Sequence, residues 1–196
     1  MQAGRWQTTA GIGLQGKTLG VYAYGKIGSG VAKVGKAFGM KVVCWGRDGS
    51  TAKARAEGFD VAASREAFFA QSDIVTIHLP LNKETRGLIT GADLALMKPT
   101  ARIVNSSRAP IIAEGALVEA LKKGRPGFAA IDVFESEPVL NREHALVSMP
   151  NVLCTPHLGY VTRETYELYY AAVVDNILAY AAGAPTNVAN PDVLAR

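Results

Sequence analysis

Three side chains that could take part in chemistry stand a few residues beyond short apolar runs: Arg108, Glu137 and His157. An arginine guanidinium can pair with a carboxylate and polarise the carbonyl group next to it. A histidine can give or take a hydroxyl proton, and a glutamate bonded to its far ring nitrogen raises the histidine pKa and fixes the ring. If the three converge, they suit hydride transfer at a carbon that bears oxygen. Taken singly, each also has an ordinary interpretation, as a surface charge, a turn residue and a core histidine.

Short apolar runs alternate along the chain with amphipathic segments. Ile27, Val31, Val34 and Phe38 recur at helical spacing and define one face of a helix. Near-continuous apolar strands that alternate with helices indicate a parallel sheet covered on both faces. The predicted fold class is therefore α/β, a doubly wound parallel sheet of the Rossmann type with a long C-terminal helix over about 162–182. Strands are expected at 18–23, 41–45, 74–79, 102–105, 128–133 and 152–155.

The length of 196 residues fits one domain, since domains commonly hold roughly 100–200 residues. We expect that domain to span 1–183, followed by an extended tail over 184–196. Hydrophobic residues make up 48% of the chain and charged residues 19%, as in an ordinary globular protein. The start holds no signal region, and no apolar run reaches the about 20 residues of a membrane helix, so no membrane partner is expected. Cys44 and Cys154 form no C-x-x-C motif, which fits reduced thiols and a cytoplasmic location.

The net charge of +4 favours an anionic partner. The basic residues are scattered and form no block rich in Lys or Arg, which argues against a nucleic-acid groove. A phosphate-bearing small molecule suits the same charge balance. No metal site is assigned.

A first glycine-rich segment, residues 11–18, matches the phosphate-loop pattern G-x-x-x-x-G-K-[ST]. A phosphate loop must follow a strand and open a helix, so that its amides and the helix N-terminus converge on phosphate. This segment instead follows a polar stretch and leads into the first strand. We therefore interpret it as a turn that feeds the strand, and not as a nucleotide triphosphate site.

A second glycine-rich segment, Ala23-Tyr24-Gly25-Lys26-Ile27-Gly28, lies between the first strand and the first helix. That is the place of the dinucleotide fingerprint G-x-G-x-x-G. Gly25 would let the backbone approach a pyrophosphate, and Gly28 would let the helix pack on the strand. Ala23 replaces the first glycine, which is tolerable only if its φ stays negative. The alternative is that these are plain packing glycines.

The fingerprint also expects an acidic residue at the end of the second strand, to bind the adenosine ribose hydroxyls. Gly46 occupies that position and Arg47 follows it. Without the acid a ribose 2′-phosphate meets no like charge, and a guanidinium pairs well with phosphate, which favours NADP with Ser50 and Lys53 as helpers. Alternatively, Arg47 is a solvated turn residue that stacks on adenine and leaves NAD acceptable. The expected cofactor is NAD or NADP.

A set of further motifs runs along most of the chain. They are Trp6-Gln7, Lys17–Gly20, the fingerprint, His78–Gly87, Met97–Pro99, Asn105–Arg108, Asp132–Pro138 and Thr155–Gly159. With these motifs, in their order and at their spacings, the chain resembles the D-isomer-specific 2-hydroxyacid dehydrogenase family. As a set the motifs are specific.

The resemblance implies a role for individual residues. Arg108 matches the family's substrate-carboxylate arginine, Glu137 the acid that pairs with the histidine, and His157 the acid/base. Asp132 matches the residue that hydrogen-bonds the nicotinamide amide. Formate dehydrogenases of this family carry Gln where Glu137 stands, so 2-hydroxy or 2-oxo acids are the substrates favoured. The expected cofactor-binding residues are Gly25, Lys26, Ile27, Gly28, Arg47, His78, Leu79, Pro80, Thr85, Ser106, Asp132 and Gly159.

The chain also departs from the family's pattern. Ala109-Pro110 stands where glycines usually follow the arginine, which could reshape the nicotinamide side of the site. The Trp-Gln motif lies at residues 6–7, so the preceding segment of about 100 residues, which builds most of the family's substrate domain, is expected to be missing. In the family that segment supplies amides for the substrate carboxylate, and its closure excludes water.

Two functions follow from these expectations. The first is NAD(P)-dependent interconversion of a 2-hydroxy acid and a 2-oxo acid. The second is a dinucleotide-binding module without independent catalysis, or a truncated fragment that lacks the substrate domain. An interaction protein similar to NAD-binding corepressors is disfavoured, because their peptide cleft lies largely in the absent segment. Since relatives dimerise through the dinucleotide domain, a homodimer is expected.

Overall fold

The computed structural model describes residues 3–4, 6 and 10–195. Gln7, the second residue of the Trp-Gln motif, lies outside the described residues. The chain forms two compact units, residues 1–156 and residues 157–196. The domain boundary expected at residue 183 stays a prediction.

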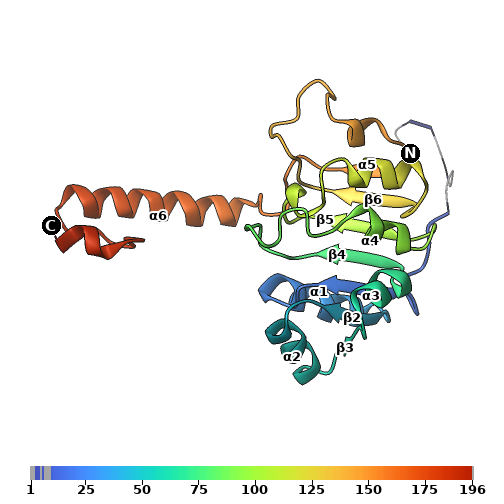
Figure 1. The fold of residues 1–196 in the computed structure, drawn as a ribbon. Coiled ribbons are helices and arrows are strands. Elements are labelled where there is room, and N and C mark those ends of the chain that lie inside the picture. The colour runs from blue at the N-terminus through green and yellow to red at the C-terminus, as the bar shows by residue number, and fades with distance from the viewer. Residues whose placement is uncertain (1–2, 5, 7–9, 196) are drawn as a thin grey trace. The chain divides into compact units, whose positions relative to one another are not determined.

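The first unit is built on a parallel sheet of seven strands in the order β3-β2-β1-β4-β5-β6-β7 (Figure 1). The chain runs from β1 outward to β3 on one side and from β4 to β7 on the other, so the predicted doubly wound α/β sheet is confirmed. Each expected strand is present, and the short edge strand β3 is an addition. The strands are β1 Thr18–Tyr22, β2 Lys41–Trp45, β3 Asp60–Val61, β4 Ile74–Ile77, β5 Arg102–Asn105, β6 Phe128–Ile131 and β7 Val152–Cys154.

The carboxyl ends of six strands lie level with one another. Tyr22 at the end of β1 pairs with the last residues of both β2 and β4, and Asn105 at the end of β5 pairs with the last residues of both β4 and β6. The last residue of β6 pairs with the last residue of β7. Loops that leave these strands therefore start from one edge of the sheet, which is where open α/β sheets bind ligands.

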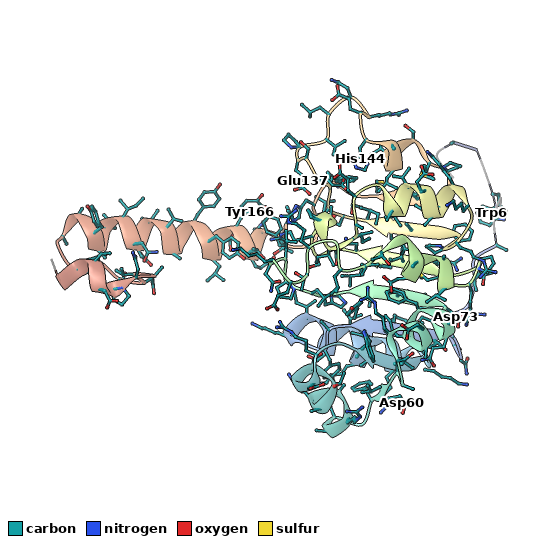
Figure 2. All side chains as sticks on the ribbon, in the orientation of Figure 1. Trp6, Asp60, Asp73, Glu137, His144 and Tyr166 are labelled. Carbon is teal, nitrogen blue, oxygen red and sulfur yellow. The ribbon has the colours of Figure 1, made fainter. Side chains whose placement is uncertain are left out.

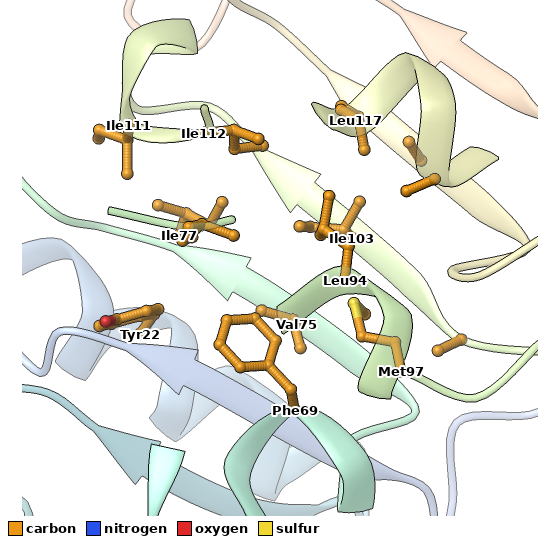
Figure 3. Packing of buried hydrophobic residues seen from close by; sticks show 14 of the residues in the cluster. Tyr22, Phe69, Val75, Ile77, Leu94, Met97, Ile103, Ile111, Ile112 and Leu117 are labelled. Atoms are coloured by element: carbon orange, nitrogen blue, oxygen red, sulfur yellow. The ribbon is translucent and has the colours of Figure 1, made fainter. Parts of the chain in front are cut away.

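Two hydrophobic cores lie on opposite faces of the sheet because strand side chains alternate in direction. Val43 of β2 belongs to the larger core, shown in part in Figure 3, and its neighbour Val42 to the smaller one. The larger core includes side chains of α3 and α5, and the smaller includes side chains of α1 and α2. The helices are α1 Lys26–Ala37, α2 Asp48–Ala56, α3 Arg65–Gln71, α4 Gly91–Leu96 and α5 Ala116–Lys122, with 3-10 helices η1 Ala109–Ile111 and η2 Ala145–Ser148.

Helix α1 turns a different face to the sheet from the one that its apolar spacing indicates. Its buried residues are Gly28, Ala32 and Gly35. The fit is tight, since a Cβ atom on Gly35 would lie 2.4 Å from a methyl carbon of Leu19. The apolar stripe expected to be one amphipathic face is mostly exposed instead: Ile27 is 70% exposed, Val34 56% and Phe38 60%. Small residues allow the helix and the sheet to approach closely, and the larger apolar side chains then point outward.

The second unit holds the expected long helix, α6 Arg163–Ala181. Thr162 is its N-cap residue, and the Thr162 side chain accepts a hydrogen bond from Thr165 N at 3.1 Å. Residues 184–196, expected to be an extended tail, include the 3-10 helix η3 Pro191–Ala195. Asn187 in this segment donates to Asn176 of α6 at 2.9 Å. Among the described residues, no helix is both long enough and apolar enough to span a membrane.

Candidate functional site

The loops at the carboxyl edge of the sheet hold most of the predicted site residues. The fingerprint follows β1, Arg47 follows β2, His78 follows β4, and Arg108 follows β5 by three residues. Asp132 comes directly after β6. The structure therefore brings the residues predicted in the first unit to one edge, although they are far apart in the sequence.

The fingerprint turn begins with Ala23 in a left-handed backbone conformation, which corrects the expectation that its φ is negative. Ala23 adopts φ 74° and not the negative φ that its side chain favours. The turn is held by its neighbours, because Ala23 N donates to Trp45 O at 2.8 Å and Tyr24 N donates to Ser50 Oγ at 2.7 Å. The backbone thus keeps the tight turn that the first fingerprint glycine normally makes, and bonds to β2 and α2 hold it there.

The two remaining fingerprint glycines differ in what surrounds them. A Cβ atom on Gly28 would lie 2.2 Å from Ala23 O, so packing inside the protein requires this glycine. A Cβ atom on Gly25 would meet nothing within 4 Å, so the space beside Gly25 is open. Gly25 is the N-cap of α1, whose first turn carries no acidic residue. Open space at a helix N-terminus is where the pyrophosphate of a dinucleotide binds, so these residues fit that group.

The 11–18 segment lies at the opposite edge of the sheet and runs directly into β1. Three of its backbone amides already have acceptors within the protein. Gly16 N donates to Gly39 O at 2.9 Å, Lys17 N to Leu14 O at 3.0 Å, and Thr18 N to Asp73 Oδ2 at 2.8 Å. The interpretation as a turn that feeds the first strand is therefore confirmed.

Arg47 is the N-cap residue of α2, and its guanidinium has an acidic partner. Its Nη1 lies 3.3 Å from Glu84 Oε2 in the loop after β4. The two proposed helpers of Arg47 have other contacts: Ser50 Oγ accepts from the fingerprint turn, and Lys53 Nζ lies 3.9 Å from Glu57 Oε1. Glu84 did not feature among the predicted site residues, because no spacing rule connects it to Arg47.

The loop after β4 is ordered by hydrogen bonds around Thr85, which is buried. Thr85 Oγ1 donates to Pro80 O at 2.6 Å and accepts from Asn82 N at 2.8 Å. His78 starts the loop with its N–H bonded to Tyr22 O at 2.9 Å, and burial lowers the pKa of its ring. Leu79 is buried beside it. These residues form the loop that lies next to the fingerprint at the carboxyl edge of the sheet.

The turn that carries Arg108 is organised by a residue that the predicted site did not include. Asn105 is 1% exposed, and its Nδ2 donates to Arg108 O while its Oδ1 accepts from Ser107 N, both at 3.0 Å. Ser107 Oγ in turn donates to Leu79 O in the neighbouring loop. Ser106 and Arg108 are exposed. An asparagine that ends an apolar strand is a signal that could have revealed this positioning role.

The segment after β6 carries Asp132 and Glu137. Asp132 is buried, its N–H donates to Asn105 O at 3.0 Å, and its Oδ1 accepts from Thr155 Oγ1 at 2.5 Å. Glu137 Oε1 accepts from Phe134 N at 2.8 Å, which closes the turn on itself. Figure 2 shows Glu137 and His144 on this same stretch of chain between β6 and β7.

His157 and Gly159 belong to the second unit, whereas Arg108 and Glu137 belong to the first. His157 has φ 54°, and its ring packs edge-on against Tyr160 with 5.6 Å between ring centroids. The convergence of Arg108, Glu137 and His157 stays a prediction.

Comparison with known proteins agrees with this arrangement. The sequence model of the family described as D-isomer specific 2-hydroxyacid dehydrogenase, NAD binding domain, matches residues 1–159. A D-3-phosphoglycerate dehydrogenase from Ralstonia solanacearum, so named provisionally, has a crystal structure that is similar with a TM-score of 0.91 and 55% identity. That similarity covers 95% of this chain and 54% of that chain.

Two curated relatives are similar along nearly the same stretch. A glyoxylate reductase from Aeropyrum pernix is 44% identical over 185 residues, which cover 94% of this chain and 55% of that protein. A D-3-phosphoglycerate dehydrogenase from Bacillus subtilis is 41% identical over 183 residues, which cover 92% of this chain and 34% of that protein. The chain thus spans about half the length of the first relative and about a third of the second. It belongs to the D-isomer specific 2-hydroxyacid dehydrogenase family and carries that family's NAD binding domain.

Proposed function

We propose that this chain is the cofactor-binding part of an oxidoreductase that transfers a hydride between NAD(P)H and a 2-oxo or 2-hydroxy acid. The observation that carries the proposal is the row of level strand ends, from which the fingerprint, His78, Arg108 and Asp132 all start. In an open α/β sheet this edge binds the dinucleotide, and a substrate must lie beside it for hydride transfer.

The protein's own groups divide the chemistry between them. Arg108, exposed at the edge, binds the substrate carboxylate and polarises the adjacent carbonyl. His157 gives a proton to the carbonyl oxygen during reduction and takes it back during oxidation. Glu137 is proposed as the acidic partner of this histidine, with the role of orienting its ring.

The residues around the fingerprint hold the dinucleotide, which supplies a hydride when it is bound. Gly25 leaves room for the pyrophosphate at the N-terminus of α1, with Lys26, Ile27 and Gly28 forming the first turn. Asp132 hydrogen-bonds the nicotinamide amide, and Gly159 is proposed as a further cofactor-binding residue. The loop residues His78, Leu79, Pro80, Thr85 and Ser106 complete the wall.

Glyoxylate is the first substrate to test, since it is the acid in the name of the Aeropyrum pernix relative. The assay follows oxidation of NADH and of NADPH by loss of cofactor absorbance, with glyoxylate, hydroxypyruvate and pyruvate as acceptors. We expect turnover with at least one acceptor, and its loss in an Arg108→Gln variant that still binds cofactor. Cofactor binding without turnover of any acceptor would contradict an independent catalytic activity.

The second candidate function is a dinucleotide-binding module without catalysis of its own. The observation that favours it is the difference in length, because the chain spans only 55% of the glyoxylate reductase that it matches. Under this alternative the chain binds NADH but reduces no acceptor until the remaining part of a full-length relative is supplied.

A homodimer through the dinucleotide domain is also proposed. The exposed side chains of Ile27 and Val34 on α1 and of its C-cap residue Phe38 support it, because large apolar side chains on one face favour association with a complementary surface. Light scattering on the purified chain should give twice the monomer mass, and Val34→Lys should reduce it to the monomer mass. We also propose a cytoplasmic location with no membrane or nucleic-acid partner, in keeping with the free thiols of Cys44 and Cys154.

A further inference from the structure

The ion pair between Arg47 and Glu84 joins two loops on either side of the fingerprint. Arg47 follows β2 and Glu84 lies in the loop after β4, and β1 stands between these two strands in the sheet. The Arg47 Nη1 to Glu84 Oε2 distance is 3.3 Å, and both side chains are largely exposed, at 73% and 75%. The pair therefore lies beside the turn where the adenosine half of a dinucleotide binds.

The carboxylate of Glu84 comes from an ordered turn. Glu84 N and Thr85 N both donate to Asn82 Oδ1, at 2.9 Å and 3.0 Å. Thr85, buried, anchors the same turn to Pro80 O. The backbone that carries Glu84 is thus fixed, and the carboxylate is kept within reach of the guanidinium.

The usual place of the acidic residue is held by Gly46, and the side chain of Ser50 lies close beside it. A Cβ atom on Gly46 would lie 3.0 Å from Ser50 Oγ and 3.5 Å from Ala23 Cα. Ser50 is held there because its Oγ accepts from Tyr24 N at 2.7 Å. A side chain at position 46 would press on Ser50 Oγ, and the acidic group beside Arg47 is Glu84, in the loop after β4.

We propose that Glu84 is a specificity-determining residue that selects NAD(H) over NADP(H) at this site. This inference rests on the proposed dinucleotide binding. A ribose 2′-phosphate needs Arg47 as its partner, and the Glu84 carboxylate competes for that guanidinium. The carboxylate also repels a phosphate group, which carries between one and two negative charges near neutral pH. A ribose that bears only hydroxyl groups meets neither penalty.

The test is a calorimetric titration of the full chain and of its Glu84→Gln variant, each with NADH and with NADPH. Glutamine keeps the size of the side chain and its hydrogen bonding but removes the charge. We expect Kd for NADPH to fall by about three- to tenfold, and the ratio of Kd for NADPH to Kd for NADH to fall with it. Adding Arg47→Ala to Glu84→Gln should remove most of the gain, because the guanidinium is what Glu84 competes for, and only the relief of repulsion remains.

Glu119→Gln is the matched control. Glu119 is an exposed acid paired with a lysine at 2.9 Å, and its substitution changes the net charge by the same amount far from the fingerprint in the sequence. This control should leave the ratio unchanged. If the chain binds NADH but Glu84→Gln leaves the ratio of Kd for NADPH to Kd for NADH unchanged, or raises it, the proposed role of Glu84 is overturned. The proposed dinucleotide binding would still stand. Failure of the unaltered chain to bind either cofactor would overturn the proposed function, and this inference with it.

Discussion

The buried side chain of Asn105 donates a hydrogen bond from Nδ2 to the backbone oxygen of Arg108 over 3.0 Å. Through Oδ1 it also accepts from Ser107 N, so one residue at the end of β5 fixes the whole turn. The guanidinium of Arg108 is exposed, but the backbone from which it extends is tied to the sheet. A residue proposed to bind a charged substrate gains accuracy when its support is rigid in this way.

Asn105→Ala should lower the stability of the fold and should leave Arg108 less firmly positioned. It leaves Arg108 O and Ser107 N without their buried partner, which costs about 2–4 kcal/mol of unfolding free energy. Urea unfolding followed by circular dichroism measures that loss. The matched control is Asn151→Ala, which removes a single side-chain hydrogen bond, to Gly127 O over 2.9 Å. The control should leave KM for the 2-oxo acid unchanged, whereas an unchanged KM in Asn105→Ala would contradict the positioning role.

Gly28→Ala should destabilise the fold, because its Cβ atom would lie 2.2 Å from Ala23 O. Relief requires α1 to move away from β1, at a cost of about 3 kcal/mol. Gly30→Ala is the control in the same helix, where a Cβ atom meets nothing within 4 Å. That variant should gain up to about 1 kcal/mol from helix propensity. Thermal unfolding of both variants checks the pair, and equal effects would contradict the tight approach of α1.

Arg108→Lys should weaken substrate binding while leaving the dinucleotide turn intact. Lysine keeps the charge but loses the planar pair of donors that fits a carboxylate, so kcat/KM should fall by about 10- to 100-fold. Steady-state kinetics with the best acceptor measures the loss, and titration with NADH checks that cofactor binding persists. Unchanged kcat/KM would remove Arg108 from the substrate site.

The ion pair between Arg65 of α3 and Asp93 of α4 should make stability depend on acid pH. Arg65 Nη2 lies 2.7 Å from Asp93 Oδ2. Burial acts to raise the pKa of Asp93, but hydrogen bonds from Arg65 and Thr90 outweigh it, and the pKa lies below its ordinary value. Because the folded-state pKa is the lower one, this stabilisation is complete above the ordinary pKa of about 3.9 and is lost as pH falls through the folded value.

Asp93→Asn isolates that contribution. At neutral pH the free energy of unfolding of the variant should be about 2–3 kcal/mol lower than that of the unaltered chain. The difference should shrink as the pH is lowered from about 5 to about 2. Urea unfolding across this range provides the measurement. A difference that stays constant with pH would show that the charge of Asp93 is not what stabilises the contact.

The sheet and most of its site-bearing loops were predictable because their signals are local. Apolar runs of strand length end at Ile77 before Pro80 and at Tyr22 before the glycine-rich turn, and parallel topology then sets the loops on one edge. The helix α1 was predictable, but its apolar spacing does not show which of its faces packs on the sheet. The small residues Gly28, Ala32 and Gly35 decide that contact.

Other features depend on the folded backbone and could not be read from the chain. The positive φ of Ala23 is held by bonds to Trp45 and, next to it, Ser50, which lie more than 20 residues away in sequence. The pairing of Arg47 with Glu84 joins two loops that only the strand order brings together. Asn105 was within reach of prediction, since a buried amide at a strand end must find backbone partners.

Calorimetric titration of the unaltered chain and its Gly25→Ala variant with NADH tests the central claim most directly. Position 25 has open space around it, so the methyl group should leave the fold intact while it occupies room that the pyrophosphate needs. We predict saturable binding at one site per chain and a loss of at least about tenfold in affinity in Gly25→Ala, with unchanged circular dichroism. Absence of saturable binding in the folded unaltered chain, or equal affinity in the variant, would contradict the account.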